Sequence, residues 1–171
     1  MSKIDYDLSK IKGIAFDVDG VLSPSTIPLN ENGIPMRMGN VKDGYALQYA
    51  VKRGLKIAVI TGGFSEAIAK RLDILGITDV WQSASYKLPI FREWVEKIGA
   101  GMDEVVYVGD DIPDLECMKE AGLACCPADA APEIRTVSGY ISKVNGGYGV
   151  ARDIIEQILK ARNLWGDGLV W

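Results

Sequence analysis

The 171-residue sequence contains no histidine. This absence excludes catalysis by Ser–His or Cys–His pairs and removes the commonest nitrogen ligand of protein-bound zinc. The three cysteines form no Cys-X-X-Cys motif, and two of them, Cys125 and Cys126, are adjacent. An odd number with this spacing predicts reduced thiols rather than a disulfide framework. Any chemistry must therefore come from carboxylates, lysine, hydroxyl groups or a metal ion.

Long apolar runs and clusters of basic residues are also missing. No stretch reaches the roughly 18 consecutive apolar residues that a transmembrane helix needs, and no cleavable leader is recognisable. Nineteen Lys and Arg against 23 Asp and Glu give a formal charge of −4. Because phosphate backbones are bound by Lys and Arg clusters, this balance argues against a nucleic-acid partner. We expect a cytoplasmic protein that binds neither membranes nor nucleic acids.

Hydrophobic residues make up 48% of the chain, and short apolar runs alternate with amphipathic stretches. The apolar runs predict buried strands and the amphipathic periods predict helices, most of which are followed by glycine. This alternation is typical of a parallel sheet with helices on both faces. We predict a single Rossmann-like α/β domain over residues 1–171. The predicted strands are 13–16, 56–60 and 104–108, with weaker candidates at 80–81, 123–126 and 140–142; the predicted helices are 43–53, 65–75, 88–98, 114–121 and 153–161.

Two segments depart from this alternation. Residues 25–41 carry Asn32-Gly33 between two apolar stretches, which predicts a small β-hairpin insertion whose prolines lie at strand edges. The tail, residues 163–171, holds two of the four tryptophans and is too apolar for a free terminus.

Polar side chains follow three of the predicted strands, at the edge where ligands gather in open α/β sheets. Each alone is usually a turn or capping residue, but several carboxylates in one crevice repel each other unless a cation is present. Hard oxygen ligands without sulfur or imidazole favour Mg²⁺. These residues are Asp17, Asp19, Thr61, Asp110 and Asp111, with Lys87 at the start of the third predicted helix.

Mg²⁺ beside a hydroxyl group and a lysine predicts a phosphate site, because the two cations attract a phosphate dianion. One carboxylate near the phosphorus can attack it and form an aspartyl phosphate. A second carboxylate two residues further on can protonate the departing oxygen and later deprotonate water. The pattern therefore indicates hydrolysis of a phosphate ester.

Four segments resemble, in order, the four motifs of the haloacid dehalogenase superfamily of phosphatases: Asp17-Val18-Asp19-Gly20, Thr61, Lys87 and Gly109-Asp110-Asp111-Ile112-Pro113-Asp114. The resemblance implies that Asp17 is the nucleophile and a Mg²⁺ ligand. It implies that Asp19 is the acid/base and lends its backbone carbonyl to the metal. The remaining implied roles are Mg²⁺ ligand for Asp110, phosphoryl binding for Thr61, Gly62 and Lys87, and support for Asp111 and Asp114.

Only a hairpin and one helix fit between the first two motifs, so we expect no large cap domain. With Asn40–Tyr45 and Gly146–Gly149 before Arg152, nearly the whole chain is similar to the capless 3-deoxy-D-manno-octulosonate 8-phosphate phosphatases. This likeness implies Mg²⁺-dependent hydrolysis of that sugar-acid phosphate, at the lipopolysaccharide-precursor step. It also implies substrate binding by Lys42, Asp43 and Arg152. Members of that family are homotetramers in which neighbouring subunits close the site. The hairpin could then form the tetramer core, and the tail could either reach an adjacent site or pack on its own domain.

Some positions depart from the family pattern and leave alternatives open. This chain has Gly63-Phe64 and Tyr148 where relatives commonly carry arginine, the residue suited to a sugar-acid carboxylate. A nine-carbon 2-keto-3-deoxy sugar acid 9-phosphate remains an alternative substrate, and a catalytically silent module an alternative role. A signalling receiver domain fits less well, because its phosphorylated Asp follows a later strand. Arg37, Lys42, Arg71 and Arg152 are the candidate partners of a substrate carboxylate, each with solvated surface charge as the competing interpretation.

Overall fold

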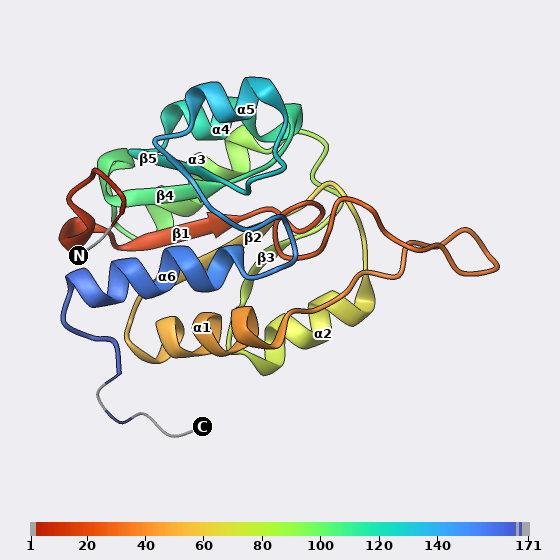
Figure 1. Cartoon of the computed structure of the whole chain (residues 1–171), viewed down its shortest axis with the longest axis horizontal. Coiled ribbons are helices and arrows are strands. Elements are labelled where there is room, and N and C mark those ends of the chain that lie inside the picture. Colours follow the sequence, from red (N-terminus) through yellow and green to blue (C-terminus); the bar gives the residue numbers. More distant parts are fainter. Residues whose placement is uncertain (1–2, 167, 169–171) are drawn as a thin grey trace.

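The computed structural model describes residues 3–166 and 168 and contains a six-stranded parallel sheet in the order β3-β2-β1-β4-β5-β6 (Figure 1). The strands are β1 (Gly13–Phe16), β2 (Lys56–Ile60), β3 (Asp79–Trp81), β4 (Val105–Val108), β5 (Leu123–Cys126) and β6 (Tyr140–Ile141). The α-helices are α1 (Val41–Lys52), α2 (Glu66–Ile74), α3 (Leu88–Lys97), α4 (Leu115–Glu120), α5 (Pro132–Val137) and α6 (Val150–Ala161). Short 3₁₀ helices are η1 (Leu8–Lys10), η2 (Met102–Glu104) and η3 (Ile112–Asp114). The predicted α/β fold is confirmed.

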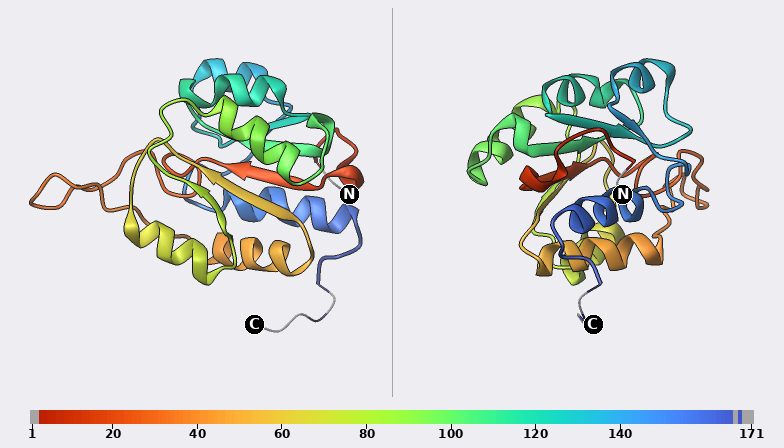
Figure 2. Two further views of the ribbon diagram at one scale, coloured as in Figure 1. Left: turned by 180° about the vertical axis from the view of Figure 1, so that it is seen from behind. Right: turned by 60° about the vertical axis from the view of Figure 1, so that its left-hand side comes forward.

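Helices cover both faces of the sheet, and each face has its own apolar cluster. Figures 1 and 2 show α1, α2 and α6 on one face and α3, α4 and α5 on the other. Leu47, Leu72 and Ile154 belong to the first cluster, and Phe91 and Trp94 belong to the second. Burial on both faces explains why the strands are apolar almost throughout.

β1 lies at the centre of the sheet, paired with β2 on one side and β4 on the other. Ala15 is in register with Ala58 of β2 and with Tyr107 of β4, and all four β1 residues are buried. The residue that follows β1, Asp17, donates its backbone N–H to the Val108 carbonyl at 3.0 Å. The pairing of β1 and β4 therefore places Asp17 at the middle of the carboxyl edge of the sheet.

The helix ends differ from the predicted ends for local reasons. α1 begins two residues earlier than predicted, because the Asn40 side chain accepts hydrogen bonds from the backbone N–H groups of Lys42 and Asp43. α6 begins at Val150, after Gly149 turns the chain with a φ of 114°. The helix α5 was not predicted. It has only six residues and begins with proline, so it offers too few turns for an apolar period to be visible.

The predicted hairpin projects from the domain as an extended arm (Figure 1). Its tip contains one antiparallel bridge, between Leu29 and Pro35, and the Asn30 N–H donates to the Ile34 carbonyl at 3.0 Å. No regular strand extends this bridge within the described residues. Proline has no N–H group, so it cannot donate to a longer ladder.

The first part of the tail packs on its own domain. The Trp165 ring lies 5.1 Å from the Tyr49 ring and 6.1 Å from the Tyr45 ring, and the Gly166 N–H donates to the Tyr49 hydroxyl at 3.1 Å. The second tail tryptophan, Trp171, lies outside the described residues. Among the described residues, no helix combines the length and the apolar character needed to cross a membrane.

Candidate active site

A pocket of about 280 Å³ opens at the carboxyl edge of β1, β2 and β4. Its lining combines residues from the loops after these three strands with one residue at the start of α3. The structure thus brings together most of the residues that the sequence singled out: Asp17, Asp19, Thr61, Gly62, Lys87, Asp110 and Asp111.

Three carboxylates meet at the floor of this pocket. Each of Asp17, Asp110 and Asp114 offers one oxygen, and these oxygens lie within 4.8 Å of one another. Burial, followed by the charge of Asp114, raises the pKa of Asp17 to about 7. The same two causes raise the pKa of Asp110 to about 8. A cluster of this kind attracts a cation, because a bound positive charge stabilises the ionised carboxylates.

Lys87 is the buried cation of the site. It is 3% exposed, and its Nζ lies 3.0 Å from Asp17 Oδ1 and 2.7 Å from Asp114 Oδ1. Burial alone lowers the pKa of Lys87, but the charges of Asp114 and Asp17 outweigh this effect and raise it. Lys87 precedes the first residue of α3, so the helix start sets where its side chain enters the pocket.

Asp114 connects the floor of the pocket to the core. Besides Lys87, its Oδ1 accepts a hydrogen bond from the Tyr107 hydroxyl at 3.0 Å, and its Oδ2 accepts the Asp110 N–H at 3.1 Å. Tyr107 is fully buried on β4 and was not singled out in the sequence. The one sequence signal for its role is a tyrosine within an apolar strand, because a buried phenol needs a hydrogen-bond partner.

The loop after β2 places Thr61 and two glycines at the pocket wall. Thr61 is 3% exposed, and its N–H donates to the Trp81 carbonyl at 2.9 Å, which extends the pairing of β2 with β3. Its Oγ1 accepts the Gly63 N–H at 3.3 Å. The loop ends at Ser65, whose Oγ accepts the Ile68 N–H and caps α2.

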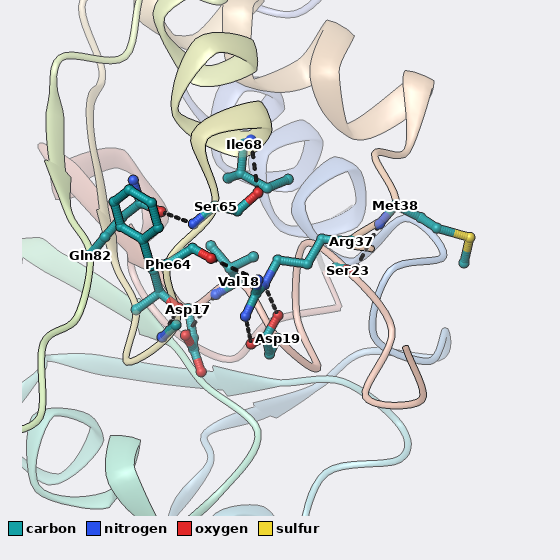
Figure 3. Close-up of polar contacts among 12 residues, drawn as sticks. Asp17, Val18, Asp19, Ser23, Arg37, Met38, Phe64, Ser65, Ile68 and Gln82 are labelled. Carbon is teal, nitrogen blue, oxygen red and sulfur yellow. Dashed lines mark hydrogen bonds and ion pairs between the residues drawn. The ribbon is translucent and has the colours of Figure 1, made fainter. Parts of the chain in front are cut away.

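The Asp19 carboxylate is held by an arginine from the foot of the hairpin. Arg37 Nε donates to Asp19 Oδ1 at 2.7 Å, and Arg37 Nη2 donates to Asp19 Oδ2 at 2.8 Å, as Figure 3 shows. Arg37 Nη1 donates to the Phe64 carbonyl at 3.0 Å. Only 6% of the Arg37 side chain is exposed. The interpretation of Arg37 as a solvated surface charge is therefore wrong.

Three residues that the sequence predicts to bind the substrate lie outside the pocket of their own chain. Lys42 and Arg152 line a separate surface hollow beside Tyr45 and Trp165. Arg152 lies over the Trp165 ring at 4.7 Å and pairs with Glu156.

The third, Asp43, is 3% exposed and lines a small apolar cavity between α1 and α2, as does Arg71. Both the Lys42–Arg152 hollow and this cavity lie on the α1 side of the sheet. A substrate-binding role within the same chain is thus not supported by where Lys42, Asp43 and Arg152 lie. The sequence could not show that these three side chains lie outside the pocket, because their directions depend on how α1 packs against α6.

The parallel sheet and its pocket of carboxylates, threonine and lysine define a class of protein, the haloacid dehalogenase-like hydrolases. The model of that family matches residues 38–122 of this chain.

Individual relatives narrow the class. A 3-deoxy-D-manno-octulosonate 8-phosphate phosphatase of Escherichia coli (strain K12) is 36% identical over 152 residues, which are 89% of this chain and 81% of that protein. The crystal structure of a phosphatase of the same name from Yersinia pestis has a TM-score of 0.89 and 32% identity, covering 94% of this chain and 87% of that one. The Moraxella catarrhalis phosphatase, solved in complex with magnesium ion, phosphate ion and a KDO molecule, has a TM-score of 0.87 and 36% identity, covering 92% and 90%. The chain belongs to this phosphatase family.

Proposed function

We propose that this protein is a Mg²⁺-dependent phosphomonoesterase that hydrolyses 3-deoxy-D-manno-octulosonate 8-phosphate to the free sugar acid and phosphate. The observation that carries the proposal is the buried contact of Lys87 with Asp17 and Asp114, beside Asp19 in one pocket. This arrangement supplies a nucleophile, a cation for the phosphoryl group and an acid/base. Membership of the phosphatase family supports the choice of substrate.

In the proposed mechanism, the Asp17 carboxylate attacks the phosphorus, and the bond from phosphorus to the sugar oxygen breaks. Asp19 gives a proton to the departing oxygen, and the phosphoryl group remains on Asp17 as an aspartyl phosphate. Asp19 then takes a proton from a water molecule that attacks the phosphorus, which releases phosphate and restores Asp17. Thr61 and Lys87 donate hydrogen bonds to the phosphoryl oxygens during both steps.

The chemistry of the donor set fits Mg²⁺, because the cluster offers only hard carboxylate oxygens. Asp114 already accepts hydrogen bonds from Lys87, Tyr107 and the Asp110 N–H. We therefore assign the metal to Asp17, Asp110 and the Asp19 backbone carbonyl, with Asp114 and Asp111 in support. When bound, Mg²⁺ neutralises charge on the phosphoryl oxygens, which lowers their repulsion of the attacking carboxylate.

The test is release of inorganic phosphate from 3-deoxy-D-manno-octulosonate 8-phosphate, with Mg²⁺ and with excess chelator. The panel includes the nine-carbon 2-keto-3-deoxy sugar acid 9-phosphate and neutral sugar phosphates. We expect the highest kcat/KM for the octulosonate substrate and no turnover with chelator. Preference for the nine-carbon acid would overturn the substrate but leave the chemistry standing. Absence of turnover on every ester would indicate a silent module.

We further propose that residues 1–171 form one catalytic domain and that four copies assemble through the hairpin arm. Leu29 and Ile34 at the tip of the arm are 62% and 55% exposed. Large apolar side chains gathered on a projecting arm are typical of a protein–protein contact. Lys42 and Arg152, which lie outside their own pocket, would then face the site of a neighbouring subunit. Light scattering should give the mass of a tetramer, and Leu29→Glu with Ile34→Glu should give smaller species. Ile74→Glu, at an exposed position of α2, is the matched control and should leave the mass unchanged.

A further inference from the structure

Asp19 lies in the described structure within a fork of hydrogen bonds that no motif of the sequence predicts. The two Arg37 nitrogens that contact it, Nε and Nη2, reach different oxygens of the carboxylate, at 2.7 and 2.8 Å. A bidentate pair of this kind fixes the plane of the carboxylate as well as its position. Since a carboxylate has about four lone-pair sites, the pair leaves a free lone pair on each oxygen. The Asp19 side chain is 36% exposed, so a free lone pair can reach a reacting oxygen in the pocket.

Arg37 is itself held in place. Its third contact, from Nη1 to the Phe64 carbonyl at 3.0 Å, anchors the guanidinium to the loop after β2. Only 6% of its side chain is exposed, whereas a surface arginine would be free to change rotamer. Figure 3 shows Arg37 reaching from the foot of the hairpin arm across to Asp19 and Phe64. The fork is therefore a fixed support that joins the turn after β1, the foot of the hairpin arm and the loop after β2.

Gly63 provides the space that the fork occupies. A Cβ atom at this position would lie 2.3 Å from Arg37 Nη2 and 3.1 Å from Asp19 Oδ2. The backbone of Gly63 does not need glycine for its conformation, because Gly63 is absent from the described glycines with positive φ. A side chain at position 63 would instead push the end of Arg37 away from Asp19. The position of Arg37 thus depends on the absence of a side chain at Gly63.

We propose that Arg37 is the positioning residue for Asp19 in both chemical steps, and that Gly63 is required for it to act. The inference rests on the proposed role of Asp19 as the acid/base. An alkyl phosphate has a poor leaving group and needs the proton from Asp19, whereas p-nitrophenyl phosphate has a good leaving group and does not. Both substrates share the second step, in which Asp19 activates water. Misplacing Asp19 should therefore affect the two substrates differently.

The first experiment compares Arg37→Gln with the wild type on 3-deoxy-D-manno-octulosonate 8-phosphate and on p-nitrophenyl phosphate. Since acid–base help contributes about 10²- to 10⁴-fold, we expect kcat/KM for the alkyl ester to fall by about 10- to 100-fold. For the aryl ester, kcat/KM should stay within about threefold, because it reports only the step up to the aspartyl phosphate. Its kcat should fall, with a burst of p-nitrophenolate in the first turnover. Arg37→Lys, which keeps one donor, should restore part of the alkyl activity.

Arg92→Gln is the matched control. Arg92 Nε donates to Glu120 Oε2 at 2.9 Å, and Arg92 Nη2 pairs with the other oxygen, so this change also breaks a bidentate pair, on the exposed surface of α3 and α4. It should leave both substrates unchanged.

Gly63→Ala tests the second half of the proposal. It should reproduce the selective loss on the alkyl ester, and the double variant with Arg37→Gln should be no worse than Arg37→Gln alone. Additive losses would overturn the coupling of Gly63 to Arg37.

Two results would overturn the role of Arg37. An equal fall in kcat/KM for both esters would indicate general damage to the pocket. No fall for either ester would show that the Arg37–Asp19 pair does not contribute to catalysis. If the wild type prefers another sugar phosphate, that ester replaces the octulosonate substrate, and only the proposed substrate is lost. A wild type without any phosphatase activity would overturn both proposals.

Discussion

At the scale of single residues, burial is what gives the site its charge properties. Lys87 and Asp114 are almost fully shielded from water and lie 2.7 Å apart. Removing one member of a buried pair leaves the other without compensation, which typically costs about 3–5 kcal/mol. Asp17 shares Lys87 with Asp114, so its negative charge is only partly balanced. The site is therefore prepared to accept a further cation.

The first prediction concerns the nucleophile. Asp17→Asn should abolish turnover on every phosphate ester, because an amide cannot form the aspartyl phosphate. The free energy of unfolding should change by less than about 1 kcal/mol, since Lys87 keeps its pair with Asp114. Phosphate release and thermal denaturation measure the two quantities. Residual turnover above the level of a mock preparation would show that another residue is the nucleophile.

The second prediction concerns Asp43, which is buried away from the pocket. Its Oδ1 accepts the Arg152 N–H at 2.7 Å, but among the described residues its Oδ2 has no hydrogen-bond partner. Burial raises the pKa of Asp43 to about 6 from an ordinary 3.8. Because the folded protein holds this proton more tightly than the unfolded chain, stability falls as the pH rises from about 4 to about 6, and it stays reduced above that range.

The measurement is the free energy of unfolding of Asp43→Asn and wild type between pH 4 and 8. A pKa difference of about two units corresponds to about 3 kcal/mol, so the wild type should lose up to that amount relative to the variant across the range. Asp73→Asn, on the exposed face of α2, is the control. Parallel pH curves for wild type and Asp43→Asn would contradict the prediction.

At the scale of elements, the loops after the strands carry the chemistry and the strands hold them in place. The connection from β1 to α1 supplies Asp17, Asp19 and Arg37, whereas the loop after β2 supplies Thr61. A further loop, residues 145–149, packs against the turn after β1. The two backbones are so close that a Cβ atom on Gly146 would lie 1.9 Å from the Gly20 carbonyl oxygen. The turn that holds Asp17 and Asp19 thus depends on a loop far away in the sequence.

The third prediction tests this contact. Gly146→Ala should force the two backbones apart, lower the free energy of unfolding by about 1–3 kcal/mol and reduce kcat. Gly39→Ala is the control, because no described atom lies within 4 Å of a Cβ at Gly39 and its φ is not positive. Denaturant unfolding and steady-state kinetics measure the effects. Equal behaviour of the two variants would show that the loop adapts freely.

At the scale of the whole molecule, the order of the strands places the pocket. The chain runs outward from β1 to β2 and β3, then crosses to the opposite side of β1 to form β4. The chain therefore leaves β1 toward β2 and leaves β4 toward β5, which opens a crevice between the two loops. Ligands of open α/β sheets bind in a crevice of this kind, where the strand order reverses. Because β1 and β4 are adjacent, the carboxylates that follow them, Asp17 and Asp110, come within reach of one ion.

The fourth prediction concerns this ion. The affinity for Mg²⁺ should rise as the pH increases from about 6 to about 8, because Asp17 and Asp110, with pKa values of about 7 and 8, must lose protons to bind it. Calorimetry at pH 7 in buffers of different ionisation enthalpy should detect proton release. At a Mg²⁺ concentration of about 100 times Kd, the folded state should gain about 2.7 kcal/mol. Asp110→Asn should remove most of this gain. Affinity independent of pH would contradict the assignment.

How far the sequence predicts this protein differs between elements. β1, β2 and β5 begin and end at the predicted residues, since a strand buried on both faces is apolar along its whole length. The hairpin follows from Asn32-Gly33. By contrast, α5 leaves no periodic signal in its six residues. Lys42 and Asp43 belong to the stretch Asn40–Tyr45 that predicted substrate binding, yet neither lines the pocket of its own chain, because the packing of α1 sets where they lie.

The alternation of strands and helices, and the set of carboxylates, threonine and lysine at the strand ends, can be read directly from the sequence. Both are local properties, set by apolar periodicity and by the residue that follows each strand. Which charges are buried together, in contrast, depends on how the elements pack. The contacts of Arg37 with Asp19 and of Gly146 with Gly20 join segments that are separated in the chain and meet through packing. Such contacts depend on the positions of several elements at once, so no single stretch of sequence encodes them.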